Sequence, residues 1–263
     1  MTPNISIRES IRWPPHAASE PTSTVVLTSG KRYYVDVRVT HPTNTDPRNS
    51  TVGEDLLPVS RIDWAFAGTS SSEIRQTPDN NKVIHSQWKH WIDSKTMDGE
   101  SVADEGDMFP DEGGELALEK GRMVNPATGL MADYEELWKE LAPQLVQLTE
   151  GEIENGPLTS NALTNDRQHA CVVLLLEDDE SQTRGMVIRV GNFCQGILRT
   201  GPHITVERWE WKKDAGWRRN MRAGDFWLPC GVVMADANSG RLVEGGEVTD
   251  KENVWKCIEF SWF

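Results

Sequence analysis

The sequence predicts an all-β fold made of two related barrel-like halves. The first observation is a pair of similar stretches, residues 63–69 followed by the Trp-bearing segment 88–91, and residues 186–192 followed by the Trp-bearing segment 209–211. In each pair a short apolar run ends at a glycine, which is typical of a repeated supersecondary unit. The second observation is that short apolar runs and turn residues follow one another along most of the chain, as in a sandwich or barrel.

The strands of the first half are predicted from alternation and turn signals. Residues 25–27 and 33–39 flank Ser29-Gly30, which suits a hairpin turn. Within 33–40, apolar or aromatic residues alternate with mostly polar ones, so one face of this strand is expected to be buried. An irregular arm is expected over residues 1–22, a loop over 41–57, and further strands over 64–68, 82–92 and 123–124.

One amphipathic helix is predicted near residues 130–142, where Pro143 would end it. A polar stretch at 150–165 contains Gly and Pro and is expected to link the halves, which gives domains 1–150 and 151–263. The apolar face of the helix would consist of Leu130, Tyr134, Leu137, Trp138 and Leu141. Strands of the second half are expected at 170–176, 186–190, 196–199, 205–211, 231–234 and 255–263.

Charge and length narrow the classes of function. A chain of 263 residues can form one large β domain or two smaller ones. The net charge of −14 argues against nucleic acid and against anionic membranes as partners. Residues 98–115 hold eight acidic residues and no Lys or Arg. They lack the spacing of a calcium loop, so we expect a solvated acidic loop.

The cysteines and the known motifs point away from secretion and from cofactors. The four cysteines form no C-x-x-C pair, and the first twenty residues lack the apolar core of a signal peptide. We therefore expect buried, reduced cysteines in a cytoplasmic protein. Phosphate-binding, dinucleotide and zinc motifs are absent from the sequence. The sequence therefore predicts no metal site and no cofactor.

Tryptophan is unusually frequent, with eleven in the chain. Tryptophan side chains bury a large area and carry one N–H group that needs a partner, so they form either the core of the fold or the wall of a pocket. An aromatic pocket would bind a flat, hydrophobic small molecule. The candidate substrate-binding residues are Trp64, Trp88, Trp91, Gln195, Trp209 and Trp211.

Three residues are candidates for catalysis. If the two similar stretches are equivalent, His90 stands where the second copy has Trp211, and a histidine there could transfer a proton near neutral pH. Asp93 lies close by, and a carboxylate buried against Trp has a raised pKa. Arg189 interrupts an apolar run and could hold an oxyanion. The alternatives are a surface histidine, a solvent-facing carboxylate and an ion-paired arginine.

Three motifs resemble those of a known family. They are residues 63–69, 134–138 and 185–196, with the sequences DWAFAGT, YEELW and GMVIRVGNFCQG. In this order they resemble the fungal Hri-type family, named for a casein-kinase-interacting protein, over about residues 25–260. The resemblance implies two β-barrel-like halves similar to lipocalin or nitrobindin barrels. It implies no catalytic residues.

Two functions remain open from the sequence. In the first, the protein binds a hydrophobic small molecule in an aromatic-lined barrel pocket, most specifically as a cofactor-independent isomerase, cyclase or lyase of fungal natural-product biosynthesis. In the second, it is a non-enzymatic protein-interaction module with a protein partner. The first requires an open cavity with a polar residue pointing inward. The second requires filled barrels and an exposed apolar patch.

Overall fold

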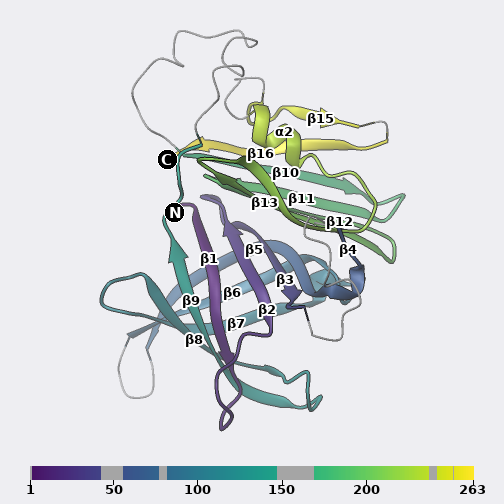
Figure 1. Ribbon diagram of the computed structural model, residues 1–263. Helices are drawn as coiled ribbons and strands as arrows, with labels where there is room; N and C mark the ends of the chain where they lie inside the picture. Colours follow the sequence, from purple (N-terminus) through teal and green to yellow (C-terminus); the bar gives the residue numbers. More distant parts are fainter. Residues whose placement is uncertain (1, 43–55, 77–81, 147–168, 237–241, 251) are drawn as a thin grey trace.

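The chain forms two layers of β-structure, a closed antiparallel barrel and a second sheet that lies against it and is antiparallel except for the pairing of its last two strands (Figure 1). This computed structural model describes residues 2–42, 56–76, 82–146, 169–236, 242–250 and 252–263. The predicted linker 150–165 and the predicted domain boundary at residue 150 lie outside these residues. The all-β prediction is confirmed.

The barrel is built from eight strands that all come from the first half of the chain. Antiparallel pairing runs around the whole ring, and β9 closes it by pairing with β1. Closure leaves the barrel without an open sheet edge. The strands are β1 (Asn4–Arg12), β2 (Thr22–Thr28), β3 (Tyr33–Thr40), β5 (Ile62–Gln76), β6 (Lys82–Asp93), β7 (Ala103–Pro110), β8 (Leu116–Val124) and β9 (Met131–Leu141).

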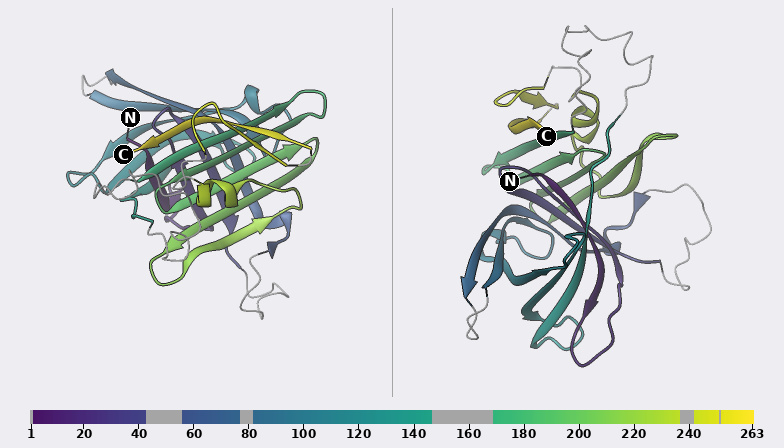
Figure 2. Two further views of the ribbon diagram at one scale, coloured as in Figure 1. Left: turned by 90° about the horizontal axis from the view of Figure 1, so that it is seen from above. Right: turned by 90° about the vertical axis from the view of Figure 1, so that its left-hand side faces the viewer.

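The second half forms an eight-stranded sheet rather than a second closed barrel. Its order is β15-β16-β10-β11-β12-β13-β14-β4, and β4 is a short strand contributed by the first half of the chain. A short helix, α2 (Cys230–Asp236), lies on the face away from the barrel (Figure 2). The strands are β10 (Ala170–Asp178), β11 (Thr183–Val190), β12 (Phe193–Thr200), β13 (His203–Lys212), β14 (Gly216–Ala223), β15 (Glu247–Thr249), β16 (Val254–Trp262) and β4 (Leu56–Leu57).

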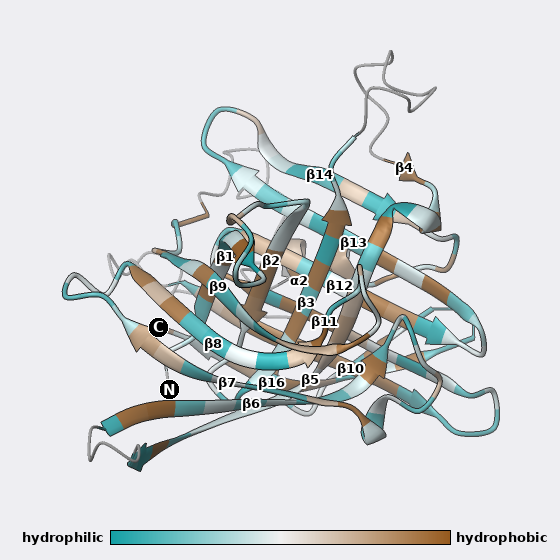
Figure 3. Cartoon of the chain, turned by 90° about the horizontal axis from the view of Figure 1, so that it is seen from below, coloured by the Kyte–Doolittle hydropathy of each residue, from teal (hydrophilic) through white to brown (hydrophobic). Residues whose placement is uncertain are grey.

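The main hydrophobic core lies between the barrel wall and the second sheet, outside the barrel itself. On β3, Val35 and Val37 point into this core, whereas Asp36 and Arg38 point into the barrel. Figure 3 shows hydrophobic and hydrophilic stretches alternating along the barrel strands. The predicted alternation in 33–40 is therefore correct, and the polar face turns toward the barrel interior. Other core members are Val25, Leu27, Ala65, Ala67 and Ile92 from the barrel and Val173, Met186, Ile188, Ile197 and Val206 from the second sheet.

The helix predicted near residues 130–142 is wrong, because Met131–Leu141 form strand β9. Tyr134 and Trp138 are four residues apart, a spacing that fits one face of a helix and also one face of a strand. Between them on the inner face stands Glu136, which is 2% exposed and bonded to Arg8. This buried carboxylate hides the strand alternation, since a glutamate normally marks an exposed position.

Three smaller predictions also differ from the structure. The expected irregular arm contains β1, and the expected acidic loop 98–115 contains β7, which pairs with β6 and β8. The strand expected at 231–234 is part of helix α2.

The two similar stretches occupy different settings. Gly68 lies inside β5 at a register shift, where an added Cβ would come within 1.9 Å of the Lys89 carbonyl oxygen. Gly191 lies in the turn between β11 and β12 with a φ of +55°. Trp88 is on β6, the direct neighbour of β5, whereas β12 separates Trp209 on β13 from β11. The equivalence assumed for His90 and Trp211 therefore does not hold in the fold.

Candidate functional site

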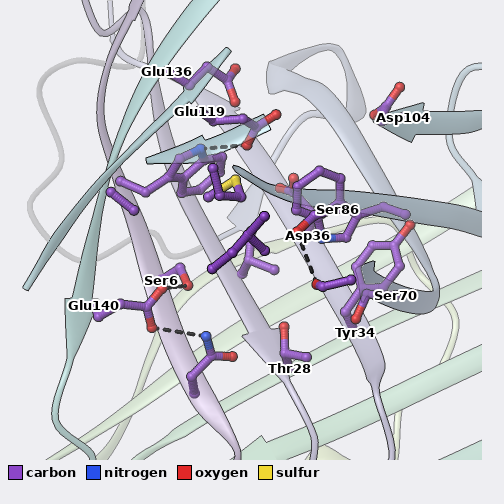
Figure 4. Close-up of a pocket in the computed structure, with 18 of the residues that line it drawn as sticks. Ser6, Thr28, Tyr34, Asp36, Ser70, Ser86, Asp104, Glu119, Glu136 and Glu140 are labelled. Carbon is purple, nitrogen blue, oxygen red and sulfur yellow. Dashed lines mark hydrogen bonds between the residues drawn. The ribbon is translucent and has the colours of Figure 1, made fainter. Parts of the chain in front are cut away.

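A cavity of about 420 Å³ lies inside the barrel, and all eight barrel strands contribute side chains to its wall (Figure 4). Its size falls in the usual range of small-molecule sites, roughly 300–1,000 Å³. The wall combines apolar and aromatic side chains with a slightly larger number of polar and charged ones. The main apolar and aromatic lining residues are Val26, Tyr34, Phe66, Trp88, Met108 and Trp138.

Two arginines and two carboxylates form a buried network on this wall. Arg38 donates to Asp36 Oδ2 at 2.8 and 3.0 Å, and its third nitrogen lies 3.6 Å from Glu136 Oε1. Arg8 donates to the same Glu136 oxygen at 2.5 Å. Burial disfavours the charge on Arg38, but Asp36 and Glu136 outweigh this and raise the pKa of Arg38. Both carboxyl groups thus have an arginine partner at a site where an unpaired charge would be costly.

Glu119 is a carboxyl group of a different character. Its two oxygens accept hydrogen bonds from Tyr134 Oη at 2.6 Å and Trp138 Nε1 at 2.9 Å. Burial, reinforced by the charge of nearby Glu136, raises the pKa of Glu119 from 4.5 to about 8. The side chain fits because residue 106 is glycine, where an added Cβ would lie 2.7 Å from Glu119 Cγ. Glu119 is therefore protonated at neutral pH and can donate a proton or a hydrogen bond.

His90 and Asp93 form a second buried pair. His90 Nδ1 lies 2.8 Å from Asp93 Oδ2, and the His90 ring stacks on Phe66 with 4.2 Å between ring centroids. Burial disfavours the charged form of His90, but the nearby carboxyl groups of Asp104 and Asp93 raise its pKa overall. The opposite balance holds for Asp93, whose pKa is lowered by His90, the Lys95 amide and other donors despite burial.

Some buried polar atoms of the barrel have no hydrogen-bond partner among the described residues. Asp36 Oδ1 is one of them, and Asp36 is 3% exposed and lines the cavity. His90 Nε2 is another, 3.5 Å from Asp104 Oδ2. A buried hydrogen-bond acceptor without a donor destabilises the protein. A ligand that donated a hydrogen bond to this acceptor would remove that cost, which would favour its binding.

The cavity has an entrance at one end of the barrel. Its exposed lining residues are Ser72, Ile84 and Pro110, which come from the hairpin of β5 and β6 and from the end of β7. Ile84 is 40% exposed, whereas Asp36 and Glu119 are nearly fully buried. An apolar ligand would therefore pass an apolar rim before reaching the charged groups.

The structure brings four of the predicted site residues together in the barrel. Trp88 lines the cavity, and Trp64 donates from Nε1 to both oxygens of Asp93, at 3.0 and 3.1 Å. Because Asp93 also holds His90, the predicted pair and Trp64 form one cluster. His90 has its side chain behind Phe66 and is not among the residues of the cavity wall. Trp91 lies elsewhere, with Arg184 stacked over its ring.

The other predicted site residues belong to the second sheet. Arg189 is 1% exposed and donates to the carbonyls of Gly191, Val233 and Met234, so it anchors the end of α2. Gln195 donates to the carbonyls of Val25 and Val35 and joins the sheet to the barrel.

Trp209 and Trp211 are also placed in the second sheet, on β13. Trp209 Nε1 donates to Glu207 Oε2, and the guanidinium group of Arg219 lies over the Trp209 ring. Trp211 is 7% exposed and pairs with Trp217 on β14. The structure therefore does not bring Arg189, Gln195, Trp209 or Trp211 into the barrel cavity.

The most polar part of the cavity is not among the residues predicted from the sequence. Burial of one face of 33–40 implies that the other face, with Asp36 and Arg38, is solvent-facing, and no sequence motif singles out Glu119. A signal was present in Asp36 and Arg38, which alternate with valines on a strand that pairs on both sides. Such a strand has two covered faces when it belongs to a closed barrel packed under another sheet.

Two kinds of feature are absent from the described residues, namely a helix able to cross a membrane and a cluster of metal-binding side chains. No helix in the described part of the chain has the length and hydropathy to cross a membrane. Among the same residues, no group of three or more His, Cys, Asp or Glu side chains is placed to hold a metal ion.

Comparisons with known proteins identify the family. One solved structure, the crystal structure of the uncharacterized protein YLR301w from Saccharomyces cerevisiae, matches with a TM-score of 0.67 at 19% identity, covering 99% of this chain and 100% of that one. At this identity the likeness shows the fold alone. Comparison with curated protein sequences gave no match. The model of the family described as Protein HRI1 matches residues 4–259. The chain therefore belongs to the HRI1 protein family.

Proposed function

We propose that this protein binds a small molecule with an apolar body inside the barrel. The observation that carries the proposal is the cavity of about 420 Å³, walled by aromatic side chains and containing a buried charged network. Folding normally fills such a space with side chains, since empty apolar volume costs stability. A space kept open beside costly buried charges is the arrangement expected of a binding site.

The position of the main hydrophobic core supports this proposal, because that core lies between the second sheet and the outside of the barrel. This core contains fully buried residues such as Val37 and Ile188. The barrel interior can therefore contain polar groups, because packing of the outer barrel wall against the second sheet stabilises the barrel. A cavity supported in this way keeps its shape when it is empty, which lowers the cost of ordering on binding.

The test is a titration with N-phenyl-1-naphthylamine, an uncharged hydrophobic dye. We expect saturable dye fluorescence with one site per chain, accompanied by quenching of tryptophan emission. Trp88→Leu removes an aromatic wall of the cavity and is expected to weaken binding by roughly tenfold. The matched control is Trp227→Leu, since Trp227 is 42% exposed and outside the cavity. Equal affinity in both variants, or no saturable binding, would count against the proposal.

A second, narrower proposal is that the same cavity catalyses a cofactor-independent isomerase, cyclase or lyase reaction of natural-product biosynthesis. The supporting observation is the contrast on one wall between Glu119, whose pKa is raised by burial, and Glu136, which is paired with Arg8, the arrangement of an acid beside a base. His90 and Asp93 would position Phe66 and Asp104 around the substrate.

Deuterium exchange provides the test of the catalytic proposal. Conjugated ketones incubated with the protein in D₂O are expected to exchange α-protons faster than without it, and Glu119→Gln is expected to remove the acceleration. Exchange at the rate of the uncatalysed reaction would contradict the catalytic proposal and leave only the binding function.

The alternative function, a protein-interaction module, is supported by exposed aromatic side chains. Phe226 and Trp227 are adjacent in the chain and are 39% and 42% exposed. We also propose the cytoplasm as its compartment, which fits four cysteines that are free and buried. A pull-down that retains a partner with wild type and loses it with Trp227→Ala would favour the interaction module.

A further inference from the structure

We infer that the barrel cavity selects ligands that carry a protonated amine on an apolar body. The inference rests on the proposed binding function and adds the chemical class of the ligand. Three observations lead to it: the two buried arginines, Arg38 and Arg8, are already paired with carboxylates, a buried carboxylate oxygen is unpaired, and the wall combines an acidic excess with aromatic rings.

The two buried arginines leave little to offer an anionic ligand. Arg32, the other arginine of the wall, donates to Ser72 Oγ at 3.3 Å. Arg38 uses two nitrogens on Asp36 and directs the third toward Glu136. Arg8, behind the wall, is bonded to Glu136, Glu20 and Thr22. A carboxylate ligand entering this site would have to displace internal carboxylates from their partners.

The unpaired polar group on the inner wall is an acceptor. Asp36 Oδ2 receives both bonds from Arg38, whereas Asp36 Oδ1 has no donor among the described residues. Asp36 points into the cavity from β3 (Figure 4). An ammonium group has three N–H donors and no acceptor, so it complements this oxygen. A ligand carboxylate or ether would place acceptor against acceptor.

The balance of charge on the wall favours the same class. Five acidic residues and two arginines line the cavity, so with Glu119 protonated the carboxylates still outnumber the guanidinium groups. Arg8 lies just behind and is itself matched by Glu20. The acidic lining residues are Asp36, Asp104, Glu119, Glu136 and Glu140, and the arginines are Arg32 and Arg38.

Aromatic side chains complete the site. Tyr34, Phe66 and Trp88 line the cavity together with Asp36. The faces of such rings attract cations, and the barrel already uses this contact, since the Arg38 guanidinium lies 5.2 Å from the centroid of the Phe66 ring. The apolar part of an amine ligand would lie along these rings while its ammonium group meets the carboxylates.

Three naphthalene probes of matched shape test the inference by calorimetry at pH 7. They are 2-(1-naphthyl)ethylamine, 2-(1-naphthyl)ethanol and 1-naphthaleneacetate. We expect the amine to bind about tenfold or more tightly than the alcohol, as for a charge-assisted hydrogen bond, and the carboxylate to bind most weakly. Equal affinities, or a preference for the carboxylate, would overturn the inference while leaving the binding function in place. Failure of all three probes to bind would overturn the proposed function itself.

Two variants locate the preference. Asp36→Asn is expected to bring the affinity for the amine down to that for the alcohol. Because this change also removes a partner of Arg38, Asp104→Asn is the second variant, and its side chain lines the cavity at 23% exposure. It is expected to lower the preference for the amine by severalfold. Asp98→Asn, outside the barrel cavity, is the matched control and is expected to leave all three affinities unchanged. An unchanged preference in folded Asp36→Asn and Asp104→Asn proteins would contradict the assigned recognition.

Discussion

The barrel and the second sheet each contain eight strands, yet they use their buried faces in opposite ways. The second sheet packs apolar side chains on both faces, against the barrel on one side and against α2 and its neighbours on the other. The barrel turns its apolar face outward to the sheet and keeps charged residues and a cavity inside. The second sheet thus provides most of the apolar packing, and the barrel can therefore contain a cavity with polar groups.

Buried arginines show the same contrast. Arg38 in the barrel faces two carboxylates, which raise its pKa. Arg189 in the second sheet faces backbone carbonyls and the ring of Trp217, and burial lowers its pKa to about 10. The barrel arginine thus belongs to a charge network, whereas the sheet arginine fastens a helix.

The largest expected effect comes from breaking that network. Arg38→Met would leave Asp36 without its cation in a buried site, and we expect a loss of about 3–5 kcal/mol in the free energy of unfolding. Arg189→Met removes hydrogen bonds to carbonyls but leaves no carboxylate unpaired, so a loss of about 1–3 kcal/mol is expected. Urea unfolding of both variants measures the difference. A larger loss for Arg189→Met would reverse the contrast drawn between the layers.

A matched pair of methionines sharpens the comparison of packing. Met186 is 1% exposed in the core between the layers, so Met186→Ala is expected to lower stability by about 2–5 kcal/mol. Met108 borders the existing cavity, where truncation creates less new empty space, and Met108→Ala is expected to cost about 1 kcal/mol. Thermal and urea unfolding report both values. Similar losses would indicate that the barrel interior is packed as tightly as the core.

Glu119 gives the barrel a pH dependence with a definite sign. Its pKa in the folded protein is raised from 4.5 to about 8, so the folded state binds more protons than the unfolded state between these values. Stability from this group is complete below about pH 4.5. It is lost as pH rises toward 8, by up to about 1.4 kcal/mol for each pH unit.

Glu119→Gln keeps the shape of the side chain and cannot ionise. The variant is therefore expected to show a flatter stability profile between pH 5 and 8 than the wild type, in chemical unfolding at each pH. The exposed Glu115→Gln serves as the control and should retain the wild-type slope. Identical slopes in wild type and Glu119→Gln would place the titrating group elsewhere.

Much of the fold followed from the sequence where one face of a strand is apolar. Residues 33–39 alternate, and the structure contains β3 there with its valines in the core. The prediction failed in β9, where Tyr134, Glu136 and Trp138 face the cavity. Sequence periodicity reports apolar against polar residues, and a barrel interior that mixes both gives no clean period.

The candidate site was predicted only in part. Trp88 and the His90–Asp93 pair lie in the barrel, as predicted. They could be predicted because tryptophans occur beside a histidine and a carboxylate in that strand. Arg189 was predicted because it interrupts an apolar run, and Gln195 lies just after that run, but both donate to backbone carbonyls of distant segments. Contacts of that kind depend on the closed fold and leave no trace in local spacing.

A crystal structure with 2-(1-naphthyl)ethylamine tests the central claim most directly, namely that the barrel interior is a binding site for apolar amines. We expect the naphthalene ring to lie beside Trp88 and the ammonium nitrogen to lie within hydrogen-bond distance of Asp36 Oδ1. The backbone of the second sheet is expected to remain unchanged. Contradiction would take the form of an empty barrel at saturating ligand, or of the ligand lying on the outer surface of the molecule.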